Sequence, residues 1–303
     1  MKKIFFVLTC FALAGSLLFS TTLKVSYYDK KYAKLASHTT DVVKDFLKHL
    51  PLEEELKPDS IHILIAESES RYRGLSGSNL PEWSNAVTIF PEKVIVVKTP
   101  DLADVGLREY DRSVKHEVVH LVHGCIAPLN TFPLWFTEGL AEYFSGGISI
   151  RDKLSIAKAL VSHNIIPLGK LRNFLSMNYY RAQLAYSEAG SLVEFLVYVY
   201  GTEAPWEIIK KTKEVKDFSM ALKWVTAVSS EEIESMWMEY LNKYYRKMIF
   251  LDAGKFIWGF LPFLLLIAYI IIKLRNKIVK LDWSEADFED EFYENSSGSS
   301  SSR

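Results

Sequence analysis

Two histidines and a glutamate form the most chemically informative pattern in this sequence. His116 and His120 stand four residues apart in HEVVH, within a segment of helical periodicity. A separation of four residues turns a helix by about 400°, so both imidazoles lie on one face and can bind one metal ion. Glu117 is one step round the helix, where its carboxylate can contact a metal-bound water without being a ligand. The motif therefore predicts a metal-activated water with Glu117 as its general base.

A second element, PLWFTEGLAEYF at residues 133–144, supplies what HEVVH lacks. HExxH alone is short enough to occur by chance on an amphipathic helix. A catalytic Zn²⁺ takes three protein ligands and keeps one position open for water, and Glu138 on an adjacent helix completes that set. Glu142, one turn later on the same face, can hydrogen-bond a ligating imidazole. An ordinary solvated carboxylate is the alternative for Glu142.

Together the two elements resemble the gluzincin clan of zinc metallopeptidases, and within it most closely the peptidase MA-like domains. HEVVH is followed after seventeen residues by the glutamate of WFTEGLAEYF. The order of strands and a helix before HEVVH is similar as well, so the resemblance covers roughly residues 22–215. It implies that His116, His120 and Glu138 bind zinc and that Glu117 acts as catalytic base and acid.

The resemblance also implies a tyrosine or histidine that stabilises the tetrahedral oxyanion opposite the metal. Tyr186 is the candidate, because LAYSEAGS at residues 184–191 is similar to the Tyr-x-x-Gly element of gluzincin aminopeptidases, with the glycine one position later. Tyr179 and Tyr180, at the other end of the same connection, are the alternatives.

The sequence departs from the aminopeptidases of this clan in one respect. Those enzymes bind the amino terminus of the substrate through Gly-x-Met-Glu-Asn on the strand before the zinc helix, and NAVTIF at residues 85–90 offers no carboxylate there. We therefore expect an endopeptidase, in which the edge Asn85–Thr88 holds an extended peptide by strand addition. An ordinary edge strand is the alternative.

His123 and Cys125 lie close to the predicted site in the sequence, but the site does not need them. The longer motif of metzincins requires Gly at position 123 and His at position 126, where this chain has His123 and Ile126. That clan is therefore disfavoured. We expect His123 to bind the C-terminal end of its own helix and Cys125 to be a small buried residue.

Two other functions are alternatives to the predicted metallopeptidase. A non-catalytic, zinc-stabilised binding module can use the same fold at a membrane, but a purely structural zinc has no use for the acid Glu117 beside an open coordination position. An intramembrane metalloprotease needs HExxH inside a spanning helix. Here the apolar stretch that follows Lys115 and Glu117 ends at Pro128, which is too short to cross a bilayer.

The predicted secondary structure that must position these residues is mixed before about residue 100 and helical after it. Alternation and β-branched composition predict strands at residues 22–28, 60–66, 86–90 and 93–98. Helical spacing predicts helices at residues 31–50, 103–124, 133–145, 184–200 and 229–249, the last running almost unbroken towards a membrane span. Glycines and a proline predict a loop at residues 69–84. The expected fold is α+β and zincin-like, with a small mixed sheet followed by a helical zinc-binding subdomain.

An apolar segment at each end of the chain predicts how the domain is held. Residues 1–21 begin with two lysines and an apolar run, which indicates a secretory signal that is cleaved or retained as an anchor. Residues 256–272 carry no charge and are long enough to cross a bilayer as a helix. A translocated N-terminal region followed by one span places the peptidase domain, residues 22–248, outside the cytoplasm, and the acidic, Ser-rich tail, residues 273–303, inside.

Composition limits the partners. The formal net charge of −1 provides no basic excess that would draw the whole protein onto nucleic acid or acidic lipid. The expected partners are a peptide or protein substrate and the membrane, and the oligomeric state stays open. Of the two cysteines, Cys10 lies in the N-terminal apolar run and Cys125 stands alone, so a metal must be held by histidine and carboxylate.

Overall fold

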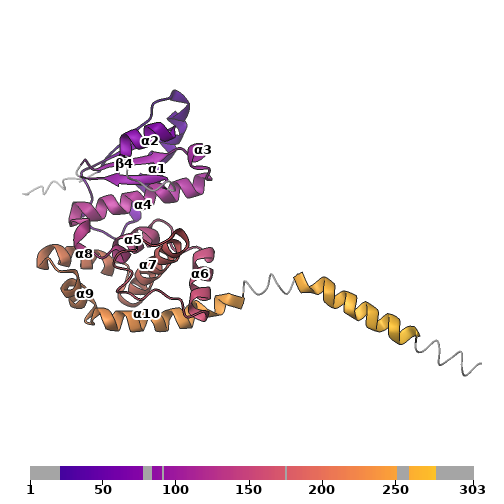
Figure 1. Ribbon diagram of the computed structural model, residues 1–303. Helices are drawn as coiled ribbons and strands as arrows, with labels where there is room; N and C mark the ends of the chain where they lie inside the picture. The colour runs from indigo at the N-terminus through magenta and orange to yellow at the C-terminus, as the bar shows by residue number, and fades with distance from the viewer. Residues whose placement is uncertain (1–20, 78–83, 91, 175, 251–258, 278–303) are drawn as a thin grey trace, which may run out of the picture. The chain divides into compact units, whose positions relative to one another are not determined.

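The computed structural model describes residues 21–77, 84–90, 92–174, 176–250 and 259–277 (Figure 1). Contacts divide the chain into a first unit, Met1–Arg246, and a second, Lys247–Arg303. The predicted signal, apart from its last residue, lies outside the described residues. So do the first three residues of the predicted span and the tail from residue 278.

The first part of the chain builds a four-stranded mixed sheet. The strands are β1 (Thr22–Ser26), β2 (Ser60–Ala66), β3 (Ala86–Ile89) and β4 (Val94–Lys98), in the order β1-β2-β4-β3. β1, β2 and β4 are parallel, whereas β3 is antiparallel to β4 and forms an edge. The predicted small mixed sheet is therefore confirmed.

Helices cover both faces of this sheet (Figure 1). α1 (Ala33–His49) and α4 (Leu107–Ile126) pack on one face, and α2 (Glu69–Ser76) packs on the other. Side chains along β4 alternate between the two faces. Ile95 and Val97 join the core that contains α1 and α4, and Val96 joins a smaller cluster with Tyr72 of α2.

The loop predicted at residues 69–84 is wrong in its first half, which forms α2. Ser68 caps this helix by accepting a hydrogen bond from the Arg71 amide at 3.3 Å, and Gly77 ends it with a φ of 89°. The buried Tyr72 anchors the helix to the sheet. A short helix with one anchoring residue has too little apolar repeat to be recognised, and its Ser cap is the only local signal.

Helices dominate the rest of the first unit. They are α5 (Leu134–Phe144), α6 (Ile150–Val161), α7 (Tyr179–Tyr200), α8 (Ala204–Val215), α9 (Phe218–Thr226) and α10 (Ser230–Tyr244). Short turns of helix are the remaining described elements up to Met248: α3 (Pro100–Ala103), η1 (Lys30–Tyr32), η2 (Glu54–Leu56), η3 (Leu129–Thr131) and η4 (Arg246–Met248).

The sequence analysis did not predict three of these helices, α6, α8 and α9, and it started α7 five residues late. α8 and α9 are followed by the capping residues Lys216 and Ala227, which have φ values of 58° and 62°. The left-handed conformation at a helix end is usually filled by glycine, so neither end is visible in the sequence. The prediction that the last helix continues to residue 249 was also wrong, because α10 ends at Tyr244.

α5 and α7 pack against each other at a glycine. A Cβ atom added to Gly139 of α5 would lie 2.3 Å from the carbonyl oxygen of Ala189 in α7. Such a distance is far below van der Waals contact, so the absence of a side chain at this position is what allows the two helices to approach.

The second unit contains a helix that fits the predicted span. Among the described residues, Gly259–Lys277 is the one helix long and apolar enough to cross a membrane, and none of its strongly apolar window is buried. An apolar core helix of a soluble domain would be covered by other elements. This helix therefore suggests that the chain is anchored in a membrane.

Gly139→Ala should destabilise the fold, because the new methyl group must push α5 away from the α7 backbone. Overpacking of this kind costs about 1–3 kcal/mol, which thermal unfolding of the metal-free chain would detect. Gly74→Ala is the matched control. A Cβ at exposed, helical Gly74 meets no atom within 4 Å, so this change should raise stability by about 0.5–1 kcal/mol. Equal effects of the two substitutions would contradict the close packing.

Candidate metal centre

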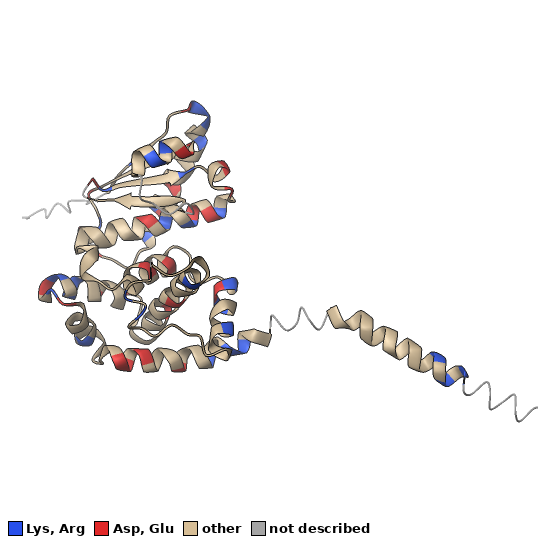
Figure 2. Cartoon of the chain, viewed as in Figure 1, with Lys and Arg blue, Asp and Glu red and all other residues tan. Residues whose placement is uncertain are grey.

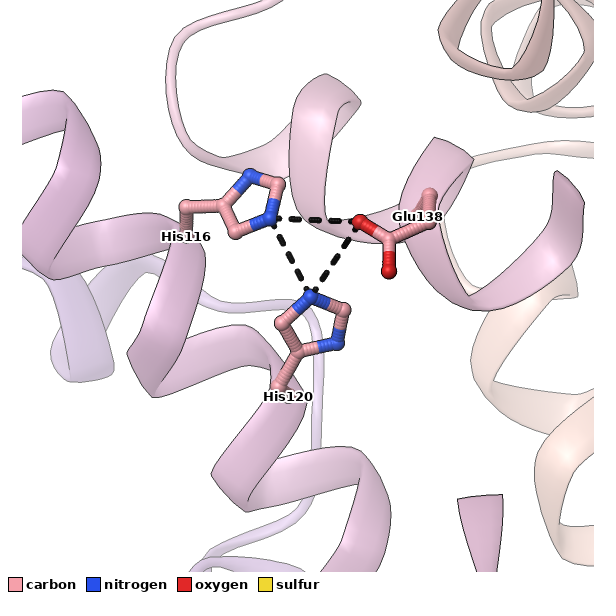
Figure 3. A group of neighbouring side chains, drawn as sticks. All are labelled: His116, His120 and Glu138. Carbon is pink, nitrogen blue, oxygen red and sulfur yellow. Dashed lines mark hydrogen bonds and ion pairs between the residues drawn. The ribbon is translucent and has the colours of Figure 1, made fainter. Parts of the chain in front are cut away.

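Three side chains from two helices converge on one point (Figure 3). His116 and His120 come from α4, and Glu138 comes from α5. The two Nε2 atoms are 3.1 Å apart, and each lies 3.5 Å from Oε2 of Glu138. A tetrahedral Zn²⁺ with bonds of about 2.0–2.1 Å requires ligand atoms separated by about 3.3–3.4 Å. The three donors are thus of the right type and at the right separations for such an ion.

The local sequence explains why these polar groups face one another. α4 buries an apolar face through Val114, Val118 and Leu121, which leaves His116 and His120 on the side towards α5. α5 follows Pro133 and is apolar around Glu138, with Trp135 and Leu140 among its buried residues. Glu138 is therefore a carboxylate placed on an otherwise apolar helix, opposite two imidazoles.

The site is shielded from solvent, and its electrostatics favour a cation. The side chains of His116, His120 and Glu138 are 18%, 13% and 16% exposed. Burial lowers the pKa of His116, but the contact with Glu138 and the charges of Glu142 and Glu117 outweigh it and raise that pKa to about 9. Burial likewise raises the pKa of Glu138, and the two histidines outweigh it and hold that pKa well below its usual range. The carboxylates thus attract positive charge to this point.

Glu142 and Arg112 extend the site behind His116. Oε1 of Glu142 lies 3.5 Å from Nδ1 of His116, and Oε2 of Glu142 accepts a hydrogen bond of 2.6 Å from Nη2 of Arg112. With neutral imidazoles, the carboxylates of Glu117, Glu138 and Glu142 and the one guanidinium leave a net charge of −2. That charge matches a divalent cation.

Arg112 is a site residue that the sequence analysis missed. It stands four residues before His116 on α4, so the two side chains share a helix face. That spacing, read together with Glu142 one turn after Glu138, was the available signal. This spacing identifies Arg112 as a partner of Glu142 only if α5 lies beside α4, and the sequence alone does not specify that packing.

Glu117 is held by the edge strand. The hydroxyl of Thr88 on β3 lies 2.8 Å from Oε2 of Glu117 and 2.9 Å from the Glu117 carbonyl oxygen, and it donates its single proton to one of them at a time. The predicted edge Asn85–Thr88 thus overlaps an edge strand that contacts α4 beside the three converging donors. The contact of Thr88 with Glu117 was not predicted, because no local pattern links two residues that are 29 positions apart.

The phenol of Tyr186 is affected by the negative charges of the site. It is half-buried near the start of α7, with its ring edge-on to Phe174 at a centroid distance of 5.0 Å. Burial, followed by the charges of Glu138, Glu142 and Glu117, raises the pKa of its phenol. The alternatives, Tyr179 and Tyr180, are 51% and 85% exposed.

His123 differs from its expected role. Its imidazole is fully buried against the rings of Phe132 and Phe136, at centroid distances of 4.4 Å and 6.1 Å. Neither ring nitrogen has a hydrogen-bond partner among the described residues, so the predicted bond to the end of its own helix is absent there. Burial, assisted by His120, lowers its pKa to about 3. Cys125 is a half-buried free thiol.

Comparison with known proteins places this geometry in a family. The family model of the peptidase MA superfamily matches residues 58–243, which is more than half of the chain. A protein of Bacillus subtilis (strain 168), described as uncharacterized protein YhcO, is 25% identical over 158 residues. That match covers 50% of this chain and 46% of the relative, so the chain spans about half the length of the relative.

Zinc affinity should rise with pH up to about pH 9. His116 in the metal-free chain has a pKa of about 9, so below that pH its proton must leave before zinc binds. Loss of one proton makes the affinity rise about tenfold per pH unit. An unperturbed histidine would end this rise near pH 7. Competition with a chelator of known proton affinity measures the slope, and a plateau beginning at pH 7 would contradict the raised pKa of His116.

Arg112→Gln should weaken zinc binding, because it frees Glu142 from the arrangement that orients His116. Changes to groups that support a metal ligand typically cost about 10–100-fold in affinity. Arg108→Gln, an exposed arginine one turn earlier on α4, is the matched control and should have no effect.

The double substitution Arg112→Gln with Glu142→Gln tests the route of this effect. If Arg112 acts through Glu142, the double variant should lose much less zinc affinity than the sum of the losses of free energy of binding caused by Arg112→Gln and Glu142→Gln alone. Full additivity would show that Arg112 supports the fold in some other way.

Proposed function

Because this chain belongs to the peptidase MA superfamily, we propose that it is a zinc-dependent peptidase, and specifically an endopeptidase held at a membrane. The observation that carries the proposal is the convergence of His116, His120 and Glu138 from two helices, with Glu117 beside them. A structural metal site needs ligands alone. A carboxylate next to the first ligand, hydrogen-bonded by Thr88, fits a site that moves protons.

Zinc held by His116, His120 and Glu138 would supply a Lewis acid that makes a water molecule nucleophilic at neutral pH and polarises the scissile carbonyl. Glu117 is the proposed base, which accepts a proton from the attacking water and delivers it to the leaving amine. The bond from Thr88 to Oε2 of Glu117 leaves Oε1 available for that transfer.

Tyr186 is the proposed oxyanion donor. Its pKa is raised by burial and by the three carboxylates, so the phenol keeps its proton throughout the neutral range. A neutral phenol can donate a hydrogen bond to the negative oxygen that develops on the substrate. The same negative charges oppose the loss of the phenol proton during the reaction, so Tyr186 donates a hydrogen bond without ionising.

β3 is the proposed binding edge for the substrate. It is one of the two outer strands of the sheet and carries Thr88 beside Glu117, so a peptide paired with its free edge would run past the candidate metal centre. Pairing through the backbone tolerates many sequences. Because NAVTIF contains no carboxylate to bind a free amino terminus, the proposed cut lies within the peptide.

The proposed topology places the metal centre outside the cytoplasm. The helix Gly259–Lys277 supports membrane anchoring, and the apolar start of the chain supports translocation of the domain that lies between. Protease added to intact cells should remove this domain and spare a tag fused after Arg303. Digestion of that tag in intact cells would invert the proposed orientation.

Glu117→Gln should separate metal binding from chemistry. The amide contributes no bond to the metal, so the solubilised full chain should keep about one zinc. It cannot accept the proton of the attacking water, so cleavage of a peptide library should fall by at least about 10²- to 10⁴-fold. Metal analysis and mass spectrometry of the digest measure the two quantities. Cleavage at a near-normal rate by the zinc-loaded variant would contradict the mechanism.

Two further variants act as controls for that experiment. His116→Ala should lose both zinc and cleavage, because it removes a ligand. Tyr186→Phe should keep zinc and lose about 10²-fold in turnover; an unchanged turnover would remove only Tyr186 from the site. A wild-type chain that binds zinc and cleaves no peptide, with or without chelator, would favour a binding module.

A further inference from the structure

Tyrosine rings gather on the surface where α7 and α10 end. Tyr198 lies in the last turn of α7, and Tyr240 and Tyr244 lie in the last two turns of α10. Their ring centroids are separated by 5.4 Å, 5.5 Å and 4.9 Å, and the hydroxyl oxygens of Tyr198 and Tyr244 are 2.7 Å apart. Tyr198 is 61% exposed and Tyr244 is 40% exposed. These three side chains are called the tyrosine patch below.

Basic residues lie next to the tyrosine patch in the sequence. Residues 240–250 contain Lys243, Arg246 and Lys247 but no aspartate or glutamate, and residues 195–202 are uncharged. Lys243 and Arg246 are exposed, and Nζ of Lys243 lies 5.1 Å from the ring centroid of Tyr244. Most acidic residues of α10 lie in its first turns (Figure 2), Glu239 stands directly before Tyr240, and basic residues follow at the C-terminal end of the helix. Exposed phenol rings next to cationic side chains are typical of surfaces at the membrane–water boundary.

The chain itself limits how far the tyrosine patch can be from a bilayer. Twelve residues, 247–258, separate Arg246 from Gly259, the first residue of the candidate membrane helix. Whatever their conformation, such a segment spans at most about 45 Å. A surface tethered this closely meets lipid headgroups at a high effective concentration, so individually weak contacts are sufficient. This step rests on the proposed membrane anchoring.

We propose that the tyrosine patch, together with Lys243 and Arg246, docks on a bilayer surface that carries anionic lipid headgroups. The phenol rings lie at the level of the headgroups, and the ammonium and guanidinium groups pair with lipid phosphates. Tyr186 and Tyr198 are separated by about 18 Å of continuous helix in α7. Docking one end of α7 therefore limits how far the candidate metal centre stands from the bilayer, and favours peptide segments presented within that distance.

Hydroxyl-radical footprinting of the full chain tests this proposal without a label. The chain is placed in nanodiscs of phosphatidylcholine with 30% phosphatidylglycerol, in nanodiscs of phosphatidylcholine alone, and in an amphipathic polymer without lipid. Oxidation of Tyr198 and Tyr244 should fall only in the anionic nanodiscs. Tyr28 and Tyr180, which are 75% and 85% exposed, serve as internal controls whose oxidation should not change.

The variant Lys243→Gln with Arg246→Gln tests the charged contacts. Each basic side chain near an anionic surface favours the docked state about fivefold, so losing two should lower the docking equilibrium about 25-fold. Tyr198 and Tyr244 should then oxidise in anionic nanodiscs as they do in the polymer. Arg108→Gln with Lys115→Gln removes the same charge from α4 and should leave their protection intact.

Three results would overturn the proposal. The first is equal oxidation of Tyr198 and Tyr244 in all three preparations. The second is protection that is as strong in phosphatidylcholine alone and survives the double substitution, since headgroup charge would then play no part. The third is protection in the polymer that grows with protein concentration, which would make the patch a contact between copies of the chain. A chain that does not insert into nanodiscs at all would contradict the membrane anchoring as well.

Discussion

The contact between Glu138 and the two imidazoles of α4 is the constraint on which the rest of this structure depends. A buried carboxylate is costly unless an opposite charge or hydrogen-bond donors meet it, and Glu138 stands on a helix whose other buried residues are apolar. His116 and His120 provide that partner at 3.5 Å. α5 must therefore lie beside α4, and Gly139 allows the same helix to approach α7 closely.

Four elements from both halves of the first unit meet around that contact. α4 provides the imidazoles and Glu117, α5 provides Glu138 and Glu142, β3 provides Thr88, and α7 carries Tyr186, the proposed oxyanion donor. Two of the carboxylates have a partner that restrains them: Arg112 holds Glu142, and Thr88 holds Glu117. A site assembled from preoriented groups loses little free energy to reorganisation during a reaction. The same arrangement couples the sheet edge, where we propose that the substrate binds, to the carboxylate that we propose moves its protons.

Local patterns in the sequence were sufficient for part of this account. Two histidines at a spacing of four, a glutamate on the next helix and β-branched strands each leave a periodic trace, and the structure brings together the three proposed ligands. The contacts of Arg112 and Thr88 could not be predicted from such local patterns, because their partners Glu142 and Glu117 are 30 and 29 residues away. The ends of α8 and α9 were missed because Lys216 and Ala227 take a conformation typical of glycine. His123 was misjudged because aromatic packing, which depends on the tertiary fold, replaces its hydrogen bonds.

X-ray absorption at the zinc K-edge of the full chain tests the central claim most directly, because it reports the ligand atoms of the bound metal. The arrangement of His116, His120 and Glu138 predicts four light ligands, with two imidazoles and oxygen from a carboxylate and a water at about 2.0–2.2 Å. A sulfur ligand at about 2.3 Å, which only a cysteine thiolate would supply, or a third imidazole, which only another histidine would supply, would contradict it.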